Sequence, residues 1–277
     1  MPHSVTSPGL RRIWLCADDY GLSPGVNAAI RDLLERGRIN ATSVMTVTPA
    51  FTREEAASLA AIKASSRGIA IGLHVTLTAP FRSLTGNEAF QPVGAALRTS
   101  MIRRLDTENI AREERAQIMA FQDMFGAAPD FVDGHQHVQL FPQIREAVVT
   151  AVAEALPQAW MRQCGRLSPL AARLADRKGL LLDLLSSGFR KTANRRGIGF
   201  NPGFAGSYDF NAKADYAALF PRFLRNIPAQ GVIMCHPGFV DETLKRLDPL
   251  TDLREREHGF FVSDRFPQIL AEHRITL

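Results

Sequence analysis

The stretch RIWLCADDYGLSPGVNAAIRDLLERG (residues 12–37) decides the fold class, because it predicts a buried strand, a loop and a helix in direct succession. Two adjacent carboxylates, Asp18 and Asp19, directly follow the short apolar run that forms the strand. Ser23 is suited to the N-cap of the helix, and Gly37 is suited to the position just after its last turn. The stretch therefore predicts a strand and helix unit with two like charges where the strand ends.

Short apolar strands and amphipathic helices alternate along the rest of the chain. Further strands are predicted at residues 42–47, 69–75, 130–138, 160–164 and 231–236, and helices at 107–125, 168–186 and 213–226 and from residues 52 and 142. An insertion with many Pro and Gly spans residues 79–101. Six or seven such units predict an α/β fold whose parallel sheet is closed or partly closed into a (β/α) barrel. No glycine-rich phosphate loop follows a predicted strand, so a nucleotide-binding open sheet is not indicated.

Length and composition are those of a folded protein with a sizeable core. The chain has 277 residues, of which 45% are apolar. We expect a flexible N-terminal extension at residues 1–10 and a single domain over residues 11–277. No apolar run approaches the roughly 18 residues of a membrane helix, and the N-terminus lacks a secretory signal, so the cytoplasm is the expected location. The cysteines, at positions 16, 164 and 235, are expected to be reduced core thiols.

Positive charge is concentrated in one window. The net charge is +5, but residues 161–200 contain nine Lys or Arg against Asp176 and Asp183, which is +7. No zinc finger, aromatic RNA-binding pattern or arginine-rich tail favours nucleic acid. One hypothesis is that the basic, leucine-rich stretch 166–191 contacts a membrane surface peripherally and presents a glycolipid. The alternative is a barrel helix with a solvated basic face, and a homodimer is also left open.

Polar side chains follow several of the predicted strands. In a (β/α) barrel, catalytic residues lie at the C-terminal ends of the strands, where all strands meet on one face. The residues in such positions are Asp18, Asp19, His74, Asp133, His135, His137, Arg162 and His236. We therefore expect these side chains, which come from distant parts of the sequence, to lie around one site.

The stretch DFVDGHQHVQ (residues 130–139) contains the densest group of such residues. If it stays extended, side-chain alternation places Asp133, His135 and His137 on one side, together with Gln139. Two histidines and one carboxylate around an open position bind a divalent metal and leave room for water and substrate. The candidate ligands are Asp19, His74 and either His135 or His137.

Each candidate also has a less specific interpretation. A lone histidine such as His74 is more often a hydrogen-bonded core or surface residue than a ligand. Asp18 and Asp19 are acidic residues just before a helix, where they are favoured, although Ser23 already suits the N-cap. His236 precedes Pro-Gly, which is typical of a turn, but an imidazole there could also serve as a general acid.

Four motifs together resemble one protein family, the YdjC-like carbohydrate deacetylases, which include chitooligosaccharide deacetylases. The motifs are ADDYGLSPGVN (17–27) with TSVMT (42–46) beyond it, IGLHVTLT (71–78), VDGHQHVQLFP (132–142) and CHPG (235–238). They occur in the order of the family, from about residue 11 to the end of the chain. The resemblance implies a distorted (β/α) barrel similar to a TIM barrel, and metal-dependent removal of an acetyl group from an N-acetylated sugar.

The resemblance also implies roles for particular residues. The metal ligands would be Asp19, His74 and His135, with Mg²⁺ or Zn²⁺ as the single ion, and the catalytic base would be Asp18. By a looser analogy with related polysaccharide deacetylases, His236 would be the acid. Family members often carry a histidine where this chain has Gln139, and Tyr20 replaces the more usual Phe.

The substrate is less closely defined by the resemblance. Some members of the family are tied to lipid-linked sugars, so the expected substrate is an N-acetylated oligosaccharide or glycolipid. Candidates for substrate contact are His137, Arg162, Phe204 and Tyr208, although aromatic residues in such a loop can equally anchor it to the core.

Two other functions stay open. A metal site of Asp and His at a barrel mouth also serves hydrolases of other bonds, such as phosphoesters. Few further acidic residues follow the strands, however, to hold the second ion of a two-metal phosphoesterase. A non-catalytic carbohydrate-binding barrel would be expected to lack the base or a ligand, and none is missing here.

Overall fold

A parallel sheet of seven strands forms the centre of the computed structural model, which describes residues 9–166, 177–210 and 214–277. Its strands, in spatial order, are β6 (Trp160–Met161), β5 (Phe131–Gly134), β4 (Ala70–Val75), β3 (Ala41–Val44), β2 (Trp14–Tyr20), β8 (Val232–Cys235) and β7 (Phe204–Ala205). Isolated bridges join Met161 to Phe200 and Arg166 to Phe204, so the β6 and β7 edges of the sheet approach each other. The predicted α/β fold, a distorted (β/α) barrel, is confirmed.

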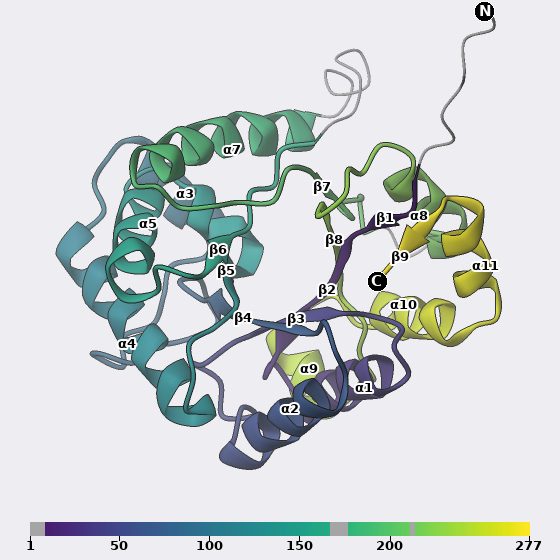
Figure 1. The fold of residues 1–277 in the computed structure, drawn as a ribbon. Helices are drawn as coiled ribbons and strands as arrows, with labels where there is room; N and C mark the ends of the chain where they lie inside the picture. Colours follow the sequence, from purple (N-terminus) through teal and green to yellow (C-terminus); the bar gives the residue numbers. More distant parts are fainter. Residues whose placement is uncertain (1–8, 167–176, 211–213) are drawn as a thin grey trace, which may run out of the picture.

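Helices surround the sheet on its outside (Figure 1). They are α1 (Pro24–Glu35), α2 (Arg53–Ser65), α3 (Val93–Met101), α4 (Thr107–Phe125), α5 (Ile144–Ala155), α7 (Arg177–Arg195), α8 (Tyr216–Leu224), α9 (Glu242–Leu247), α10 (Asp252–Val262) and α11 (Arg265–Glu272). A 3₁₀ helix, η1 (His135–Leu140), directly follows β5. Near the two ends of the described chain, β1 (Arg11–Arg12) pairs in parallel with β9 (Ile275–Thr276).

The strands form because their side chains are buried on both faces, as the short apolar runs predict. Every residue of β3, β4, β5 and β8 is buried, which is typical of a parallel sheet covered by helices. Ser23 caps α1 by accepting a hydrogen bond from the amide of Val26, and Thr52 caps α2 through the amide of Glu55. Local sequence therefore sets where these two helices begin.

The structure differs from the sequence-based prediction in several segments. The insertion at 79–101 contains helix α3, which begins directly after Pro92. Helices α9, α10 and α11 were not predicted, and of these the charged stretch of α10 gives little amphipathic pattern. The helix predicted at 168–186 is observed as α7, which extends to Arg195. Most of the predicted extension at residues 1–10, and residues 167–176 of the proposed membrane-contacting stretch, lie outside the described residues.

Among the described residues, the model contains no helix whose length and apolar character would allow it to cross a membrane.

Glu114 on α4 provides a test of the packing that is independent of the site. Its side chain is fully buried, and neither carboxylate oxygen has a hydrogen-bond partner among the described residues. Burial, together with the charge of Glu113, raises the pKa of Glu114 well above its usual value. Above that usual value the folded state holds a proton that the unfolded state has lost, so stability falls as the pH rises.

We expect Glu114→Gln to reduce this loss, which amounts to about 1.4 kcal/mol per pH unit between the two pKa values. Urea unfolding at pH 5 and pH 9 measures the free energy of unfolding, and its change between the two pH values gives the loss. Glu154→Gln, at an exposed position, is the matched control. An equal loss of stability in wild type and Glu114→Gln would contradict the prediction.

Candidate functional site

Asp18 and Asp19 reach the same cavity because β2 is irregular at its end. In a regular strand, adjacent side chains point to opposite faces of the sheet. The pairing of β2 with β3 changes register between Ala17 and Tyr20, and Asp19 has φ of 70°. That left-handed conformation is uncommon for residues other than glycine. The irregularity therefore allows two neighbouring carboxylates to line one site.

The cavity has a volume of about 430 Å³ and is formed where strands β2, β4, β5 and β8 end. It is lined by Asp18, Asp19, His74, His135, Gln136, His137, Phe210, Met234, His236, Asp248, Pro249, Leu250 and Arg254. Seven of the strand-end residues singled out in the sequence were Asp or His, and six of these line this one cavity. The seventh, Asp133, lies directly behind it.

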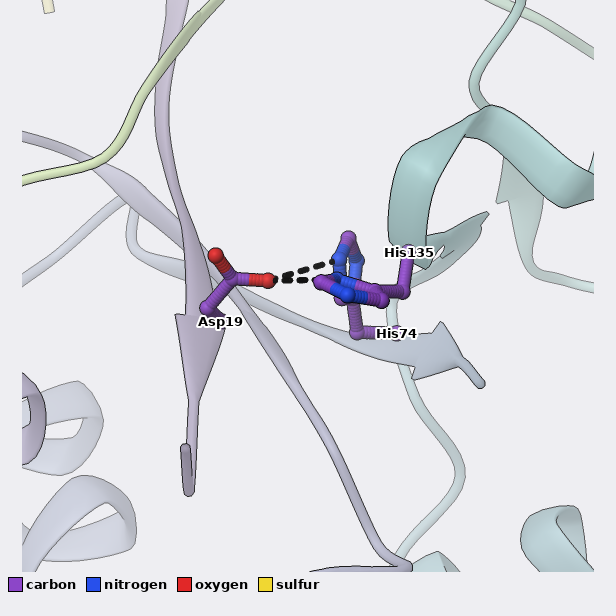
Figure 2. Close-up of side chains that lie close together, drawn as sticks. All are labelled: Asp19, His74 and His135. Atoms are coloured by element: carbon purple, nitrogen blue, oxygen red, sulfur yellow. Dashed lines mark hydrogen bonds and ion pairs between the residues drawn. The ribbon is translucent and has the colours of Figure 1, made fainter. Parts of the chain in front are cut away.

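Asp19, His74 and His135, which we call the ligand cluster, point toward one another (Figure 2). Oδ1 of Asp19 lies 3.2 Å from Nε2 of His74 and 2.9 Å from Nδ1 of His135. One ligand atom from each residue lies within 4.8 Å of the other two, and all three side chains are buried. These are the three residues that the family resemblance implied as metal ligands.

His74 is oriented by residues behind the cluster. Its Nδ1 lies 2.6 Å from Oδ1 of Asp133 and 3.0 Å from the hydroxyl of Ser43. Burial alone would lower the pKa of His74, but the charge of Asp133 raises it to about 10. A carboxylate that holds one ring nitrogen of a histidine fixes the other nitrogen for a metal, so Asp133 presents Nε2 to the cavity.

The prediction that residues 130–139 stay extended is wrong. Strand β5 ends at Gly134, and η1 follows at once, with φ of 54° at Gln136 and 60° at His137. This turn directs His135 to Asp19, whereas Nδ1 of His137 lies 3.5 Å from the thiol of Cys164. His135 and His137 therefore line the same cavity but contact different partners, and the turn rather than strand alternation places them there.

Gln139 is fully buried on the far side of η1. Its amide nitrogen donates to the backbone oxygen of Arg162 at 3.1 Å. A Cβ at Gly134 would lie 2.7 Å from the other amide atom of Gln139, so only glycine allows this close packing. Gln139 thus supports the end of β5 and contacts the strand beside it.

Asp18 is held by a bidentate ion pair. The two terminal nitrogens of Arg162 donate to its two oxygens at 2.6 and 2.7 Å, and Arg162 also lies 3.1 Å from Oδ2 of Asp133. All three side chains are buried. Burial alone would raise the pKa of Asp18, but Arg162 lowers it to about 2. Asp18 is therefore ionised at neutral pH and fixed in orientation.

Arg254 and Glu257 on α10 contact the site, and the sequence analysis missed both. Arg254 donates to Oδ2 of Asp19 at 2.7 Å, and Glu257 accepts the backbone N–H of His236 at 2.6 Å. The hydroxyl of Tyr208 donates to the other oxygen of Glu257 at 2.7 Å. Burial raises the pKa of Glu257 to about 7. In the sequence, these two residues look like any members of the charged stretch DLRERE (252–257), so no local signal identifies them.

His236 lies at the edge of the site, next to the proposed base. Its Nε2 is 4.0 Å from Oδ2 of Asp18, and Phe210 packs edge-on against its ring at 5.4 Å between centroids. Burial lowers the pKa of His236, so the free imidazole is neutral at pH 7. Phe210 lines the cavity and was not among the predicted site residues.

Three of the predicted substrate contacts lie behind the cavity lining rather than in it. Arg162 is fully buried against Asp18, and Phe204 packs on His137 with ring centroids 5.8 Å apart. Tyr208 is half-buried and bound to Glu257. Of that group only His137 lines the cavity. The contact of these residues with substrate stays a prediction.

The charges of the site fit a divalent cation. Arg162 and Arg254 together contact four carboxylates, those of Asp18, Asp133, Asp19 and Asp248. Four carboxylates, two guanidinium groups and His74, whose pKa of about 10 keeps it protonated while no metal is bound, leave one net negative charge in a largely buried region, which is costly without compensation. Imidazole nitrogens and a carboxylate oxygen are also the donors that Zn²⁺ and related ions accept. The ligand cluster is thus suited in both charge and chemistry to one such ion.

A second acidic group lies close by but already has a cation. It consists of Cys16, Asp18 and Asp133, whose ligand atoms also lie within 4.8 Å of one another. Arg162 contacts both carboxylates, and burial raises the pKa of the Cys16 thiol well above its usual value. This group therefore binds the arginine, and the donor geometry points to one metal position among the described residues.

Comparison with known proteins agrees with the motifs and the fold. The family model described as YdjC-like protein matches residues 12–272. Chitooligosaccharide deacetylases from Escherichia fergusonii and Yersinia pestis are 29% and 28% identical to the chain, over 83% and 82% of its length and 82% of theirs. A solved structure from Enterococcus faecalis, of a protein whose proposed activity is cellobiose-phosphate cleavage, has a TM-score of 0.74 at 21% identity and covers 97% of both chains. At that identity the likeness shows the fold alone.

The ion pair of Asp18 gives a prediction about stability. Arg162→Met would leave Asp18 and Asp133 buried without their cation, and breaking a buried pair in this way costs about 3–5 kcal/mol. Chemical denaturation measures the loss. As a control, Arg53→Met removes an ion pair with Asp123 whose side chains are 67% and 68% exposed, and solvent screening should make its effect small. Similar losses in the two variants would contradict the assigned role of Arg162.

Proposed function

The chain belongs to the YdjC-like protein family, and we propose that it is a metal-dependent carbohydrate N-deacetylase. It would hydrolyse the amide bond of an N-acetylated sugar, either an oligosaccharide or a glycolipid, and release acetate. The observation that carries the proposal is the position of Asp18, an ionised carboxylate fixed by Arg162 directly beside the ligand cluster. The relatives named chitooligosaccharide deacetylases support the type of substrate.

The ligand cluster would hold one divalent cation, Zn²⁺ or Mg²⁺. When bound, such an ion polarises a carbonyl group and lowers the pKa of water from about 15.7 toward 7. The residues around the ion would orient its ligands. Asp133 keeps Nε2 of His74 facing the cavity, and Arg254 holds the second oxygen of Asp19.

Asp18 would act as the general base. Its pKa of about 2 keeps it ionised at neutral pH, so it can accept a proton from the attacking water, but a carboxylate with so low a pKa is a weak base that releases the proton again at once. The bidentate contact with Arg162 restrains rotation of the carboxylate and leaves Oδ2 on the side of His236. Such fixed geometry is needed because proton transfer depends on close, aligned contact.

His236 would deliver the proton to the leaving amine. Because its free imidazole is neutral at pH 7, it must first gain a proton, and Asp18 lies 4.0 Å away. The proton taken from water by Asp18 would pass to His236 and then to the sugar nitrogen as the amide bond breaks. The imidazolium form proposed from the sequence would thus arise during each reaction cycle.

The apolar part of the cavity lining would contact the sugar. Phe210, Pro249 and Leu250 lie in the same lining as the acids and histidines, the mixture that is typical of small-molecule sites. His137 remains the polar candidate beside them. A single domain over residues 11–277, a cytoplasmic location and the state of association stay predictions.

Two substitutions should distinguish the proposed base, Asp18, from a proposed metal ligand, His74. Asp18→Asn should keep the cation and lower deacetylation by about 10²- to 10⁴-fold, the usual effect of losing a general base. His74→Ala should lose both cation affinity and activity, because it removes a ligand nitrogen. Metal content after dialysis and acetate release report the two effects. Near wild-type turnover in metal-loaded Asp18→Asn would show that the base is another residue.

The reaction itself is tested by acetate release from a panel of N-acetylated sugars and glycolipids, with and without EDTA. We expect EDTA to abolish release and one equivalent of Zn²⁺ or Mg²⁺ per chain to restore it. A requirement for two ions, or hydrolysis of phosphoesters instead, would favour the phosphoesterase alternative. Acetate release that EDTA leaves unchanged would contradict metal dependence.

A further inference from the structure

Arg254 links the ligand cluster to the C-terminal part of the chain. Its side chain is buried, with 1% exposure. One terminal nitrogen, Nη2, donates to Oδ2 of Asp19 at 2.7 Å and to Oδ2 of Asp248 at 2.6 Å, and Nε donates to the backbone oxygen of Leu250 at 3.0 Å. Its own backbone oxygen accepts the N–H of Gly238 at 3.2 Å. These contacts allow the guanidinium little freedom to move.

The two oxygens of Asp19 have separate partners as a result. Oδ1 faces the nitrogens of His74 and His135, whereas Oδ2 faces Arg254. A carboxylate can bind a metal through one oxygen or through both. With Oδ2 occupied by a guanidinium, only Oδ1 is directed to the position between the two imidazoles.

The same contact opposes the binding of a cation. The guanidinium is positively charged at all accessible pH values, and it shares one buried carboxylate with the ion that the cluster would hold. Two positive charges repel each other more strongly in a buried site than in water. Arg254 therefore fixes the ligand Asp19 but also competes with the metal for its negative charge.

We infer that Arg254 is a positioning residue that restricts Asp19 to one ligating oxygen and keeps the cation affinity of the ligand cluster low. A carboxylate that shares its charge with Arg254 donates less to the metal, which stays a stronger Lewis acid. The inference rests on the proposed function only in that the cluster takes a divalent cation. It distinguishes Arg254 from Arg162, which holds the base and not a ligand.

A purely structural role for Arg254 makes the opposite prediction. If the residue served only to hold Asp19 in place, its loss would disorder the cluster and weaken cation binding. If it competes with the cation, its loss adds a net negative charge to the site and frees Oδ2, so that binding becomes tighter while turnover falls. Cation affinity therefore separates the two roles.

The experiment compares wild type, Arg254→Gln and the charge-conserving control Arg254→Lys. Dissociation constants for Zn²⁺ and Mg²⁺ are measured by calorimetry on EDTA-treated protein, and kcat is measured with each ion. We expect Arg254→Gln to bind the ion more tightly, by roughly 10- to 100-fold, because a buried positive charge beside the ligand Asp19 is removed, and to have a lower kcat. Arg254→Lys should stay close to wild type in affinity.

A second variant keeps the test decisive if Arg254→Gln does not fold. Arg254→Met removes the same positive charge and keeps a long side chain, so competition with the cation predicts tighter binding, whereas a purely structural role predicts weaker binding. Equal or weaker cation binding in whichever of the two variants folds would overturn the inference.

The outcomes also separate this inference from the proposed function. Tighter binding in Arg254→Gln without acetate release from any substrate would support the role of Arg254 and contradict the deacetylase. Acetate release by wild type with equal affinities in all variants would contradict the inference alone. Absence of cation binding in wild type would contradict both.

Discussion

The site depends on how two adjacent carboxylates are kept charged inside the protein. Asp18 and Asp19 are each 2% exposed, and two buried like charges next to each other would favour protonation of one. Two buried arginines prevent this, because Arg162 binds Asp18 and Arg254 binds Asp19. The bulge at the end of β2 directs both acids to one cavity. The different partners distinguish the two acids, which is why Asp18 is proposed as the base and Asp19 as the ligand.

The partners come from segments far apart in the chain. Arg162 follows β6 at one edge of the sheet, whereas Arg254 is supplied by α10, which packs outside the opposite half. A curled sheet brings these segments to the same end of the barrel. The geometry of the cavity thereby depends on the whole sheet, and a change that opened the barrel would be expected to break both ion pairs, Arg162–Asp18 and Arg254–Asp19, at once.

Helix α10 contributes more to the site than any motif suggests. Besides Arg254, it carries Glu257, which accepts hydrogen bonds from the backbone of His236 and from Tyr208. Tyr208 in turn packs on Phe210, with the two ring centroids 4.2 Å apart, and Phe210 lines the cavity. One helix therefore holds Asp19 and the backbone of His236 directly, and through Tyr208 it supports Phe210 in the cavity wall. No sequence motif marks Arg254 or Glu257 as part of the site.

The sequence by itself determined six of the seven strands of the sheet, the barrel class and the family, because apolar runs, caps and motifs are local properties of the chain. Its family resemblance also implied the three members of the ligand cluster. It could not determine which face His135 and His137 take, since two residues with positive φ end the strand alternation after Gly134. It also could not identify Arg162 as the partner of Asp18, or Arg254 and Glu257 as parts of the site. Those assignments depend on contacts between residues that are far apart in the sequence. The separation is 144 positions for Arg162 and Asp18, 235 for Arg254 and Asp19, and 21 for Glu257 and His236, and only the tertiary structure brings each pair within hydrogen-bond distance.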